Sequence, residues 1–151
     1  DDGGDALDLD RAVRGRDGRP AAYARLPRTT RAAALHALGR FLRRMHDAEV
    51  SHRDLKAPNL VARREGDRVS FALVDLEGAR VRRAPVPWRR RARDLARLDA
   101  SVGPVVSRAD RRRVLAGYFA GFRRAPVALA TFARRVAAES ARKRGASGAP
   151  R

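Results

Sequence analysis

Two short segments of this sequence carry the residue types that phosphoryl transfer needs. The first is His52-Arg53-Asp54-Leu55-Lys56-Ala57-Pro58-Asn59, and the second is Asp75, which follows the apolar run 69–74. Phosphoryl transfer needs a carboxylate that orients the attacking hydroxyl and oxygen ligands that hold Mg²⁺ on the phosphates. Asp54 can supply the orienting carboxylate. Asn59 and Asp75 can supply the oxygen ligands.

The spacing of the first segment makes an accidental match improbable. It fits the kinase catalytic-loop pattern H-R-D-L-x-x-x-N at every specified position. Five specified residues would match by chance in roughly one chain of this length in ten thousand. A lone Asp or Asn is usually a cap or turn residue, but the joint spacing favours a catalytic reading.

The segment after Asp75 departs from the pattern of protein kinases. The usual D-F-G is replaced by Asp75-Leu76-Glu77-Gly78, and no A-P-E motif follows. No Ser, Thr or Tyr occurs between Ser70 and Ser101, so this segment cannot be phosphorylated on a hydroxyl. The absence of a long activation segment favours a small or sugar-like acceptor over a peptide.

Composition limits the class of protein. A chain of 151 residues is one domain or part of one, and its 44% hydrophobic share is enough for a core. It has no Cys, no signal peptide and no apolar run of transmembrane length, which indicates a soluble protein in a reducing compartment.

The charge is large and uneven. The net charge is +18, and residues 79–151 hold 20 bases and four acids, whereas residues 1–10 hold five Asp. Of the 35 bases only Lys56 and Lys143 are lysines, which indicates a bias in the base composition of the genome. Such a surface attracts anionic partners. The stretch from Arg80 to Arg93 is expected to face an anionic membrane.

Apolar spacing and breakers predict the order of the elements. Helices are expected near residues 7–13, over 31–48 after an N-cap at Thr29 or Thr30, over 89–102, from Ser107, and from Pro126. Residues 14–27 read as a loop. Strands are expected over 60–63 and 69–74, around the turn Glu65-Gly66-Asp67.

This order predicts an α+β, mostly helical fold of the kind found in the C-terminal lobe of a protein-kinase-like protein. A small β-hairpin would lie beside the catalytic loop. No Gly-rich phosphate loop or strand lysine precedes His52. We therefore expect residues 1–143 to be the lobe of a longer protein whose N-terminal lobe is absent. Residues 144–151 are expected to be a disordered basic tail.

The chain resembles the lipopolysaccharide kinase (Kdo/WaaP) family over most of residues 1–124. The resemblance rests on the catalytic-loop segment, on Val74-Asp75-Leu76-Glu77-Gly78-Ala79-Arg80, and on Arg93-Asp94-Leu95-Ala96-Arg97-Leu98. It implies an enzyme that uses ATP and Mg²⁺ to phosphorylate a sugar hydroxyl of the lipopolysaccharide inner core. The expected location is the cytoplasm, at the inner face of the inner membrane.

The resemblance also implies roles for single residues. Asp54 and Lys56 would be catalytic, with Lys56 neutralising charge on the transferred phosphoryl group. Lys56, Asn59 and Asp75 would bind the nucleotide, with Asn59 and Asp75 as the metal ligands. Asp94 would hold the backbone of the catalytic loop, and His52 would brace that loop from beneath.

Other readings of the same residues stay open. The chain can instead belong to a kinase with a small-molecule or Ser/Thr protein acceptor, or be a non-catalytic basic binding module. Aromatic residues are only 5% of the chain and keep core spacing, so no stacking platform for nucleic acid is expected. The expected partners are a lipid-linked sugar acceptor and an anionic membrane surface. Residues 1–151 alone are expected to be inactive and to bind ATP weakly.

Overall fold

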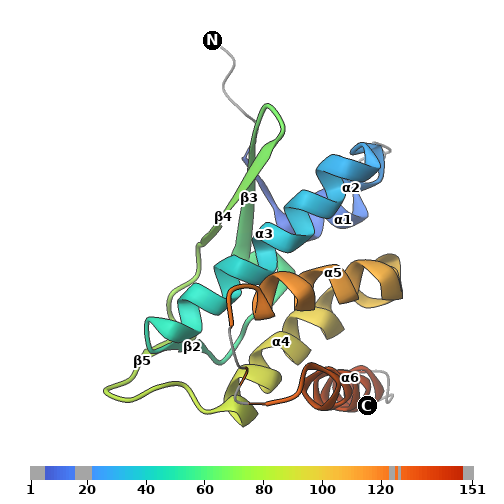
Figure 1. Cartoon of the computed structure of the whole chain (residues 1–151). Helices are drawn as coiled ribbons and strands as arrows, with labels where there is room; N and C mark the ends of the chain where they lie inside the picture. The colour runs from blue at the N-terminus through green and yellow to red at the C-terminus, as the bar shows by residue number, and fades with distance from the viewer. Residues whose placement is uncertain (1–5, 16–21, 123–124, 126, 148–151) are drawn as a thin grey trace.

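The computed structural model describes residues 6–15, 22–122, 125 and 127–147. Helices dominate, and short strands lie along one side of them (Figure 1). The elements in chain order are β1 (Ala6–Asp8), α1 (Leu9–Arg14), α2 (Ala22–Arg25), α3 (Arg28–Asp47), β2 (Val50–His52), η1 (Ala57–Asn59), β3 (Leu60–Glu65), β4 (Arg68–Leu73), β5 (Ala79–Val81), α4 (Trp88–Val102), η2 (Gly103–Val105), α5 (Arg108–Phe119) and α6 (Leu129–Ser147). The expected α+β, mostly helical class is confirmed.

The strands form two small antiparallel sheets. In the larger sheet β3 lies between β1 and β4, with Leu60 opposite Leu73 and Glu65 opposite Arg68. Gly66 has φ +57°, which a two-residue hairpin turn requires, so the predicted turn is confirmed. Along β4 the more buried residues alternate with exposed ones, because one face of the hairpin packs on α3.

The second sheet pairs β2 with β5 and brackets the catalytic loop. Ser51 lies opposite Arg80 and His52 opposite Ala79. The whole of β2 lies next to the C-terminal end of α3, at one end of the helical layer (Figure 1). The pairing brings the segment after Asp75 back against the strand that enters the catalytic loop.

Two glycines let α3 and α5 cross in direct backbone contact. A Cβ on Gly39 would lie 2.0 Å from the carbonyl oxygen of Val114, and one on Gly117 would lie 2.1 Å from the carbonyl oxygen of His36. Any larger residue at either position would force the helices apart. Neither glycine has a positive φ. Their small size therefore serves packing rather than a turn.

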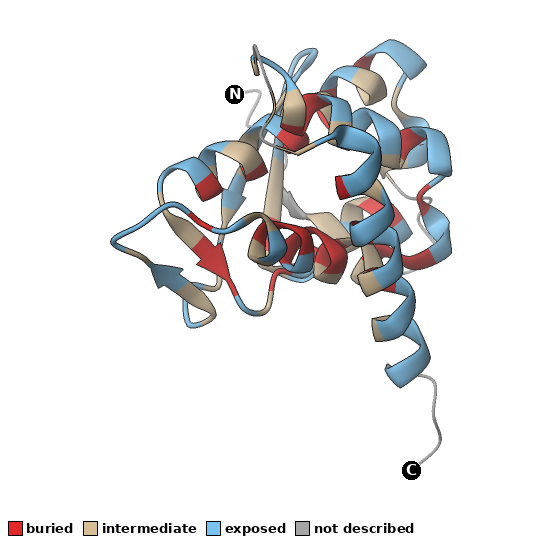
Figure 2. Ribbon diagram, turned by 60° about the horizontal axis from the view of Figure 1, so that its bottom comes forward, coloured by how far each residue is buried: buried red, intermediate tan, exposed pale blue. Residues whose placement is uncertain are grey.

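The core lies between the helical layer and the hairpin. Leu42, Leu55, Leu60, Ala92 and Ala96 are fully buried there. Buried residues concentrate in α4 and β2, whereas the last turns of α6 are exposed (Figure 2).

An aromatic cluster closes the end of the core near α6. Its members are Trp88, Tyr118, Phe119, Phe122 and Phe132, whose ring centroids lie 5.4–6.4 Å apart. Tyr118 and Phe132 are the largest fully buried side chains. Aromatic rings at these separations attract one another beyond simple burial.

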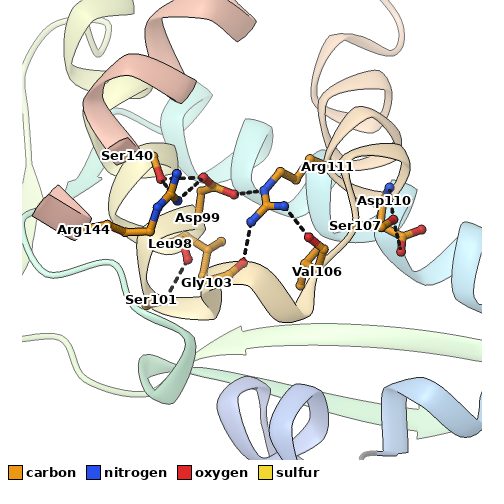
Figure 3. Close-up of polar contacts among 10 residues, drawn as sticks. All are labelled: Leu98, Asp99, Ser101, Gly103, Val106, Ser107, Asp110, Arg111, Ser140 and Arg144. Atoms are coloured by element: carbon orange, nitrogen blue, oxygen red, sulfur yellow. Dashed lines mark hydrogen bonds and ion pairs between the residues drawn. The ribbon is translucent and has the colours of Figure 1, made fainter. Parts of the chain in front are cut away.

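A single carboxylate ties α4, α5 and α6 together. Asp99 on α4 accepts hydrogen bonds from Arg111 on α5, and from Ser140 (2.5 Å) and Arg144 (3.2 Å) on α6 (Figure 3). Arg144 also donates to the hydroxyl of Ser140 at 2.6 Å. These bonds help to hold residues 144–147 in α6. The prediction of a disordered tail is therefore wrong for these residues. Residues 148–151 lie outside the described residues.

Several expected boundaries also differ. Residues 6–8 form β1 ahead of the first helix, and the loop expected over residues 14–27 contains the short α2. The N-cap of α3 is Pro27, not Thr29 or Thr30, so α3 begins at Arg28 and Thr30 is buried. Proline suits this end because the first amides of a helix need no intrahelical acceptor.

The last two helices also depart from expectation in part. Ser107 is the N-cap of α5 as predicted and accepts from the amide of Asp110. Helix α6 begins at Leu129, which is 44% exposed, and Pro126 lies outside the described residues. Among the described residues no helix is both long and apolar enough to cross a membrane.

Candidate active site

The catalytic-loop segment is held from below by side chains of α4. The amide of His52 donates to Asp94 Oδ2 at 3.0 Å, and the amide of Ala57 donates to Ser101 Oγ at 2.9 Å. Ser101 in turn donates to the carbonyl of Leu98 (Figure 3). The expected contact of Asp94 with the loop backbone is therefore present. Both Asp94 and His52 are fully buried, so the hydrogen bond between them is shielded from water.

The imidazole of His52 connects the two segments that carry chemistry. Its Nδ1 accepts from the amide of Asp54 at 3.3 Å, so its Nε2 carries the proton and donates to the carbonyl of Asp75 at 2.6 Å. A Cβ on Gly78 would lie 2.7 Å from the ring, which explains why a glycine stands there. The expected bracing role of His52 is confirmed by these contacts.

The hairpin sets the spacing between Asn59 and Asp75. The amide of Val74 donates to the carbonyl of Asn59 at 3.0 Å, which continues the β3–β4 pairing beyond Leu60 and Leu73. Asp75 is the next residue along, so its backbone lies beside that of Asn59. Two residues 16 apart in sequence thus become neighbours at one end of the hairpin.

Only some polar side-chain atoms of the four predicted site residues form hydrogen bonds or ion pairs within the protein. The side-chain amide of Asn59 donates to the carbonyl of Asp54 at 2.8 Å, and Asp75 Oδ1 accepts from the amide of Glu77 at 3.1 Å. Lys56 Nζ lies 2.8 Å from Asp54 Oδ1, and these two side chains are 54% and 48% exposed. Solvent screens such a pair, so it contributes little stability and leaves both groups accessible.

Comparison with known proteins decides the family. The model of the lipopolysaccharide kinase (Kdo/WaaP) family matches residues 17–118, which include the catalytic loop, Asp75 and Asp94. The chain belongs to this family. No curated protein sequence matches it.

One solved structure extends the likeness to the whole fold. It is described as WaaP in complex with acyl carrier protein, and it is 27% identical to this chain with a TM-score of 0.69. The match covers 96% of this chain and 58% of WaaP. This member of the Kdo/WaaP family thus spans a little more than half the length of that relative, and its fold is that of a kinase-like C-terminal lobe.

The donor set of this family member fits a hard divalent cation. Asn59 Oδ1 and Asp75 Oδ2 accept no hydrogen bond from any residue that the structure describes. Carboxylate and amide oxygens are the ligands that Mg²⁺ prefers, and Mg²⁺ usually takes only one or two of them from a protein. The described residues contain no cluster of three or more His, Cys, Asp or Glu side chains that could hold a metal. Water and nucleotide phosphates would supply the remaining ligands.

A buried polar network behind the loop was not predicted from sequence. His46 is fully buried. Its Nδ1 lies 2.7 Å from the hydroxyl of Tyr118, and its Nε2 lies 3.4 Å from Asp94 Oδ2. Burial holds the pKa of His46 below its ordinary value, although Asp94 opposes the shift. The fourth member of this network, Arg91, donates to Asp47 at 2.8 Å.

Arg91 corrects the expected membrane face. Its side chain is only 6% exposed, and its Nε donates to the carbonyl of Val86 at 2.8 Å. Its position three residues before Asp94 in α4 gives no sign of this, because only the tertiary fold brings Asp47, at the C-terminal end of α3, within reach of Arg91. Arg91 therefore belongs to the interior and cannot attract a membrane.

Proposed function

We propose that this chain carries the catalytic loop of an ATP-dependent kinase that phosphorylates a sugar hydroxyl of the lipopolysaccharide inner core. The observation that carries the proposal is the double contact of His52, which links the backbone of Asp54 to that of Asp75. A preorganised active site needs its catalytic segments held in a fixed relation to each other. The buried imidazole of His52 does this by bonding to both segments. Membership of the Kdo/WaaP family supports the reaction class and the acceptor class.

Each site residue has a distinct role in this proposal. Asp54 orients the acceptor hydroxyl and takes its proton, while Lys56, now paired with Asp54, turns to the transferred phosphoryl group. Asn59 and Asp75 hold Mg²⁺ through Asn59 Oδ1 and Asp75 Oδ2, which accept no hydrogen bond from the described residues. ATP and Mg²⁺, when bound, supply the phosphoryl group and neutralise its developing charge.

The proposed setting is the cytoplasmic face of the inner membrane, with a lipid-linked sugar as acceptor. Arg80, Arg82, Arg83, Arg89, Arg90 and Arg93 remain as bases of the stretch that can face an anionic surface. Each contributes about 1 kcal/mol of attraction close to such a surface, and salt weakens it. Salt-sensitive binding of the protein to anionic vesicles would support this location.

The test is phosphate transfer from labelled ATP to purified lipopolysaccharide core by the native protein. Asp54→Ala and Asp75→Ala should each abolish transfer while far-UV circular dichroism stays unchanged, because orientation and metal-held charge are most of what such a site supplies. Asp67→Ala is the matched control, since Asp67 is an exposed acid in the hairpin turn. Near-normal transfer by either site variant would overturn these roles.

The same assay separates the other readings. Transfer to aminoglycosides or to a Ser/Thr peptide, with none to the core oligosaccharide, would assign a different acceptor. If the native protein binds neither ATP nor Mg²⁺, this result would instead support a non-catalytic basic module.

A second candidate function is docking of an acyl carrier protein. The solved WaaP is in complex with such a partner. This chain contains an apolar cavity of about 870 Å³ between the hairpin and the helical layer, lined by residues that include Leu9, Leu35, Phe71, Leu98 and Val136. A hollow of this size and polarity suits an acyl chain. Retention of acylated but not unacylated carrier protein by the immobilised chain would support this function.

A further inference from the structure

Five arginines line a concavity next to β2 and β5. The concavity has a volume of about 460 Å³ and is lined by Arg53, Arg80, Arg82, Arg83, Arg90, the exposed Val81 and the buried Ser51. We call it the arginine pocket. None of Asp54, Lys56, Asn59 or Asp75 lines it. It is therefore separate from the candidate active site, although Arg53 and Asp54 are consecutive.

The arginine pocket has no internal counter-charge in the part of the chain that the structure describes. No carboxylate of a described residue lies within 4.0 Å of any of its five guanidinium groups, whereas Arg91, Arg97 and Arg111 on the neighbouring helices are all paired. The side chain of Arg80 donates only to the carbonyl groups of Glu77 and Ala79. Five positive charges thus share one hollow and repel each other.

One donor in the arginine pocket lacks an acceptor altogether. Arg82 Nε is buried and makes no hydrogen bond within the described residues. Buried polar groups in folded proteins are nearly always hydrogen-bonded, and an exception calls for a missing partner. An acceptor that enters the pocket would satisfy it.

The wall of the arginine pocket is fixed by backbone contacts. Ser51 pairs with Arg80 across β2 and β5, and the amide of Arg82 donates to the carbonyl of Glu49 at 3.0 Å. Glu49 has φ +61°, a conformation that costs energy for a non-glycine residue and aims its carbonyl at the arginine segment. The backbone that carries Arg80 and Arg82 is therefore held in place before any ligand arrives.

We propose that the arginine pocket binds the phosphate group of a molecule other than this chain. Guanidinium groups donate paired N–H bonds to phosphate oxygens, and several of them around one hollow match an anionic phosphate group. The segment 71–100 contains no hydroxyl residue, so it cannot supply such a group itself. The phosphate comes from a phosphorylated sugar or from a lipid headgroup. This site does not depend on the proposed kinase activity.

The test is calorimetric titration of residues 1–151 with inorganic phosphate and with glucose 6-phosphate at low ionic strength. Arg53→Gln/Arg82→Gln should weaken binding by roughly tenfold for each arginine lost. Arg28→Gln/Arg135→Gln removes the same charge from exposed sites on α3 and α6 and should change the Kd less than about threefold. Arg82→Lys keeps the charge but removes the Nε donor, so it should weaken binding too.

Thermal unfolding checks that each variant is folded, and Arg82→Lys keeps the test decisive if the double variant is not. Equal weakening by the two double variants, or full affinity in Arg82→Lys, would overturn the proposal in favour of attraction by net charge alone.

Phosphatidylglycerol vesicles identify the source of the phosphate. If the Arg53/Arg82 variant loses more vesicle binding than the Arg28/Arg135 variant, the source is a headgroup; equal loss, with sugar phosphate binding still pocket-dependent, assigns a sugar phosphate.

Discussion

Replacing Gly39 by alanine tests the crossing of α3 and α5, on which the position of the catalytic loop depends. The new Cβ would lie 2.0 Å from the carbonyl oxygen of Val114 and 2.5 Å from the amide nitrogen of Tyr118, whereas ordinary contact begins at 3.4 Å. Both neighbours are backbone atoms of a helix, so no side chain can rotate away. The helices would have to separate by roughly 1.4 Å, which is the difference between the ordinary and the imposed distance.

The expected cost follows from three terms. Overpacking a core typically costs about 1–3 kcal/mol. Separation also removes the buried hydrogen bond between Tyr118 and His46, which costs about 1–3 kcal/mol when a partner is left unsatisfied. Alanine recovers about 1 kcal/mol because it favours a helix over glycine. We expect a net loss of about 1–5 kcal/mol. Most domains, which have about 5–15 kcal/mol of stability, would remain folded after such a loss.

Urea unfolding at equilibrium measures this loss. Trp88 is the only tryptophan and contacts Tyr118 and Phe132, so its fluorescence reports on the core next to the crossing. Gly145→Ala is the matched control, because Gly145 lies in α6 and a Cβ there meets nothing within 4 Å. That variant should gain up to about 1 kcal/mol. If Gly39→Ala stays within about 0.5 kcal/mol of the wild type, the helices do not cross at this glycine.

Three further substitutions test the supports of the site. Asp94→Ala should lower the free energy of unfolding in urea by about 1–3 kcal/mol, because the amide of His52 is left buried without an acceptor, and Asp94→Asn should lose less. Burial lowers the pKa of His46, so its contribution to the free energy of unfolding is fully present above pH ~6.5 and is lost below it, as the unfolded chain takes up the proton. His46→Gln should flatten this fall between about pH 7 and 5, and an unchanged slope would contradict the assignment. Ser107→Ala should cost about 1 kcal/mol in thermal unfolding because the amide of Asp110 loses its cap, and Ser107→Gly should cost less.

Local patterns in the sequence predicted much of the secondary structure correctly. The hairpin around Gly66, the helix that begins next to Trp88 and the Ser107 cap each depend on residues a few positions apart, and each is present. The four candidate site residues were also chosen from sequence, because the catalytic-loop spacing is itself a local pattern. Their chemical roles stay predictions.

The placement of charged residues could not be read from the sequence. Arg91 and Arg90 are consecutive bases in α4, yet Arg91 is buried against Asp47 and Arg90 lines the arginine pocket. Likewise, nothing near Arg144 indicates that it meets Asp99 and so keeps residues 144–147 helical. A stretch of basic residues in the sequence gives the net charge of that segment, but it does not show which group each side chain contacts in the fold.

The sequence by itself determined the family, the chemistry available and the order of the longer helices and of the hairpin, because these depend on residue types at short spacing. Only the tertiary structure decided how the pieces support each other. The bond from His52 to Asp75, the hold of Asp94 on the loop and the contact of Gly39 with Val114 join residues 23, 42 and 75 positions apart. Such contacts depend on how the helices pack, and packing depends on the whole set of buried side chains at once.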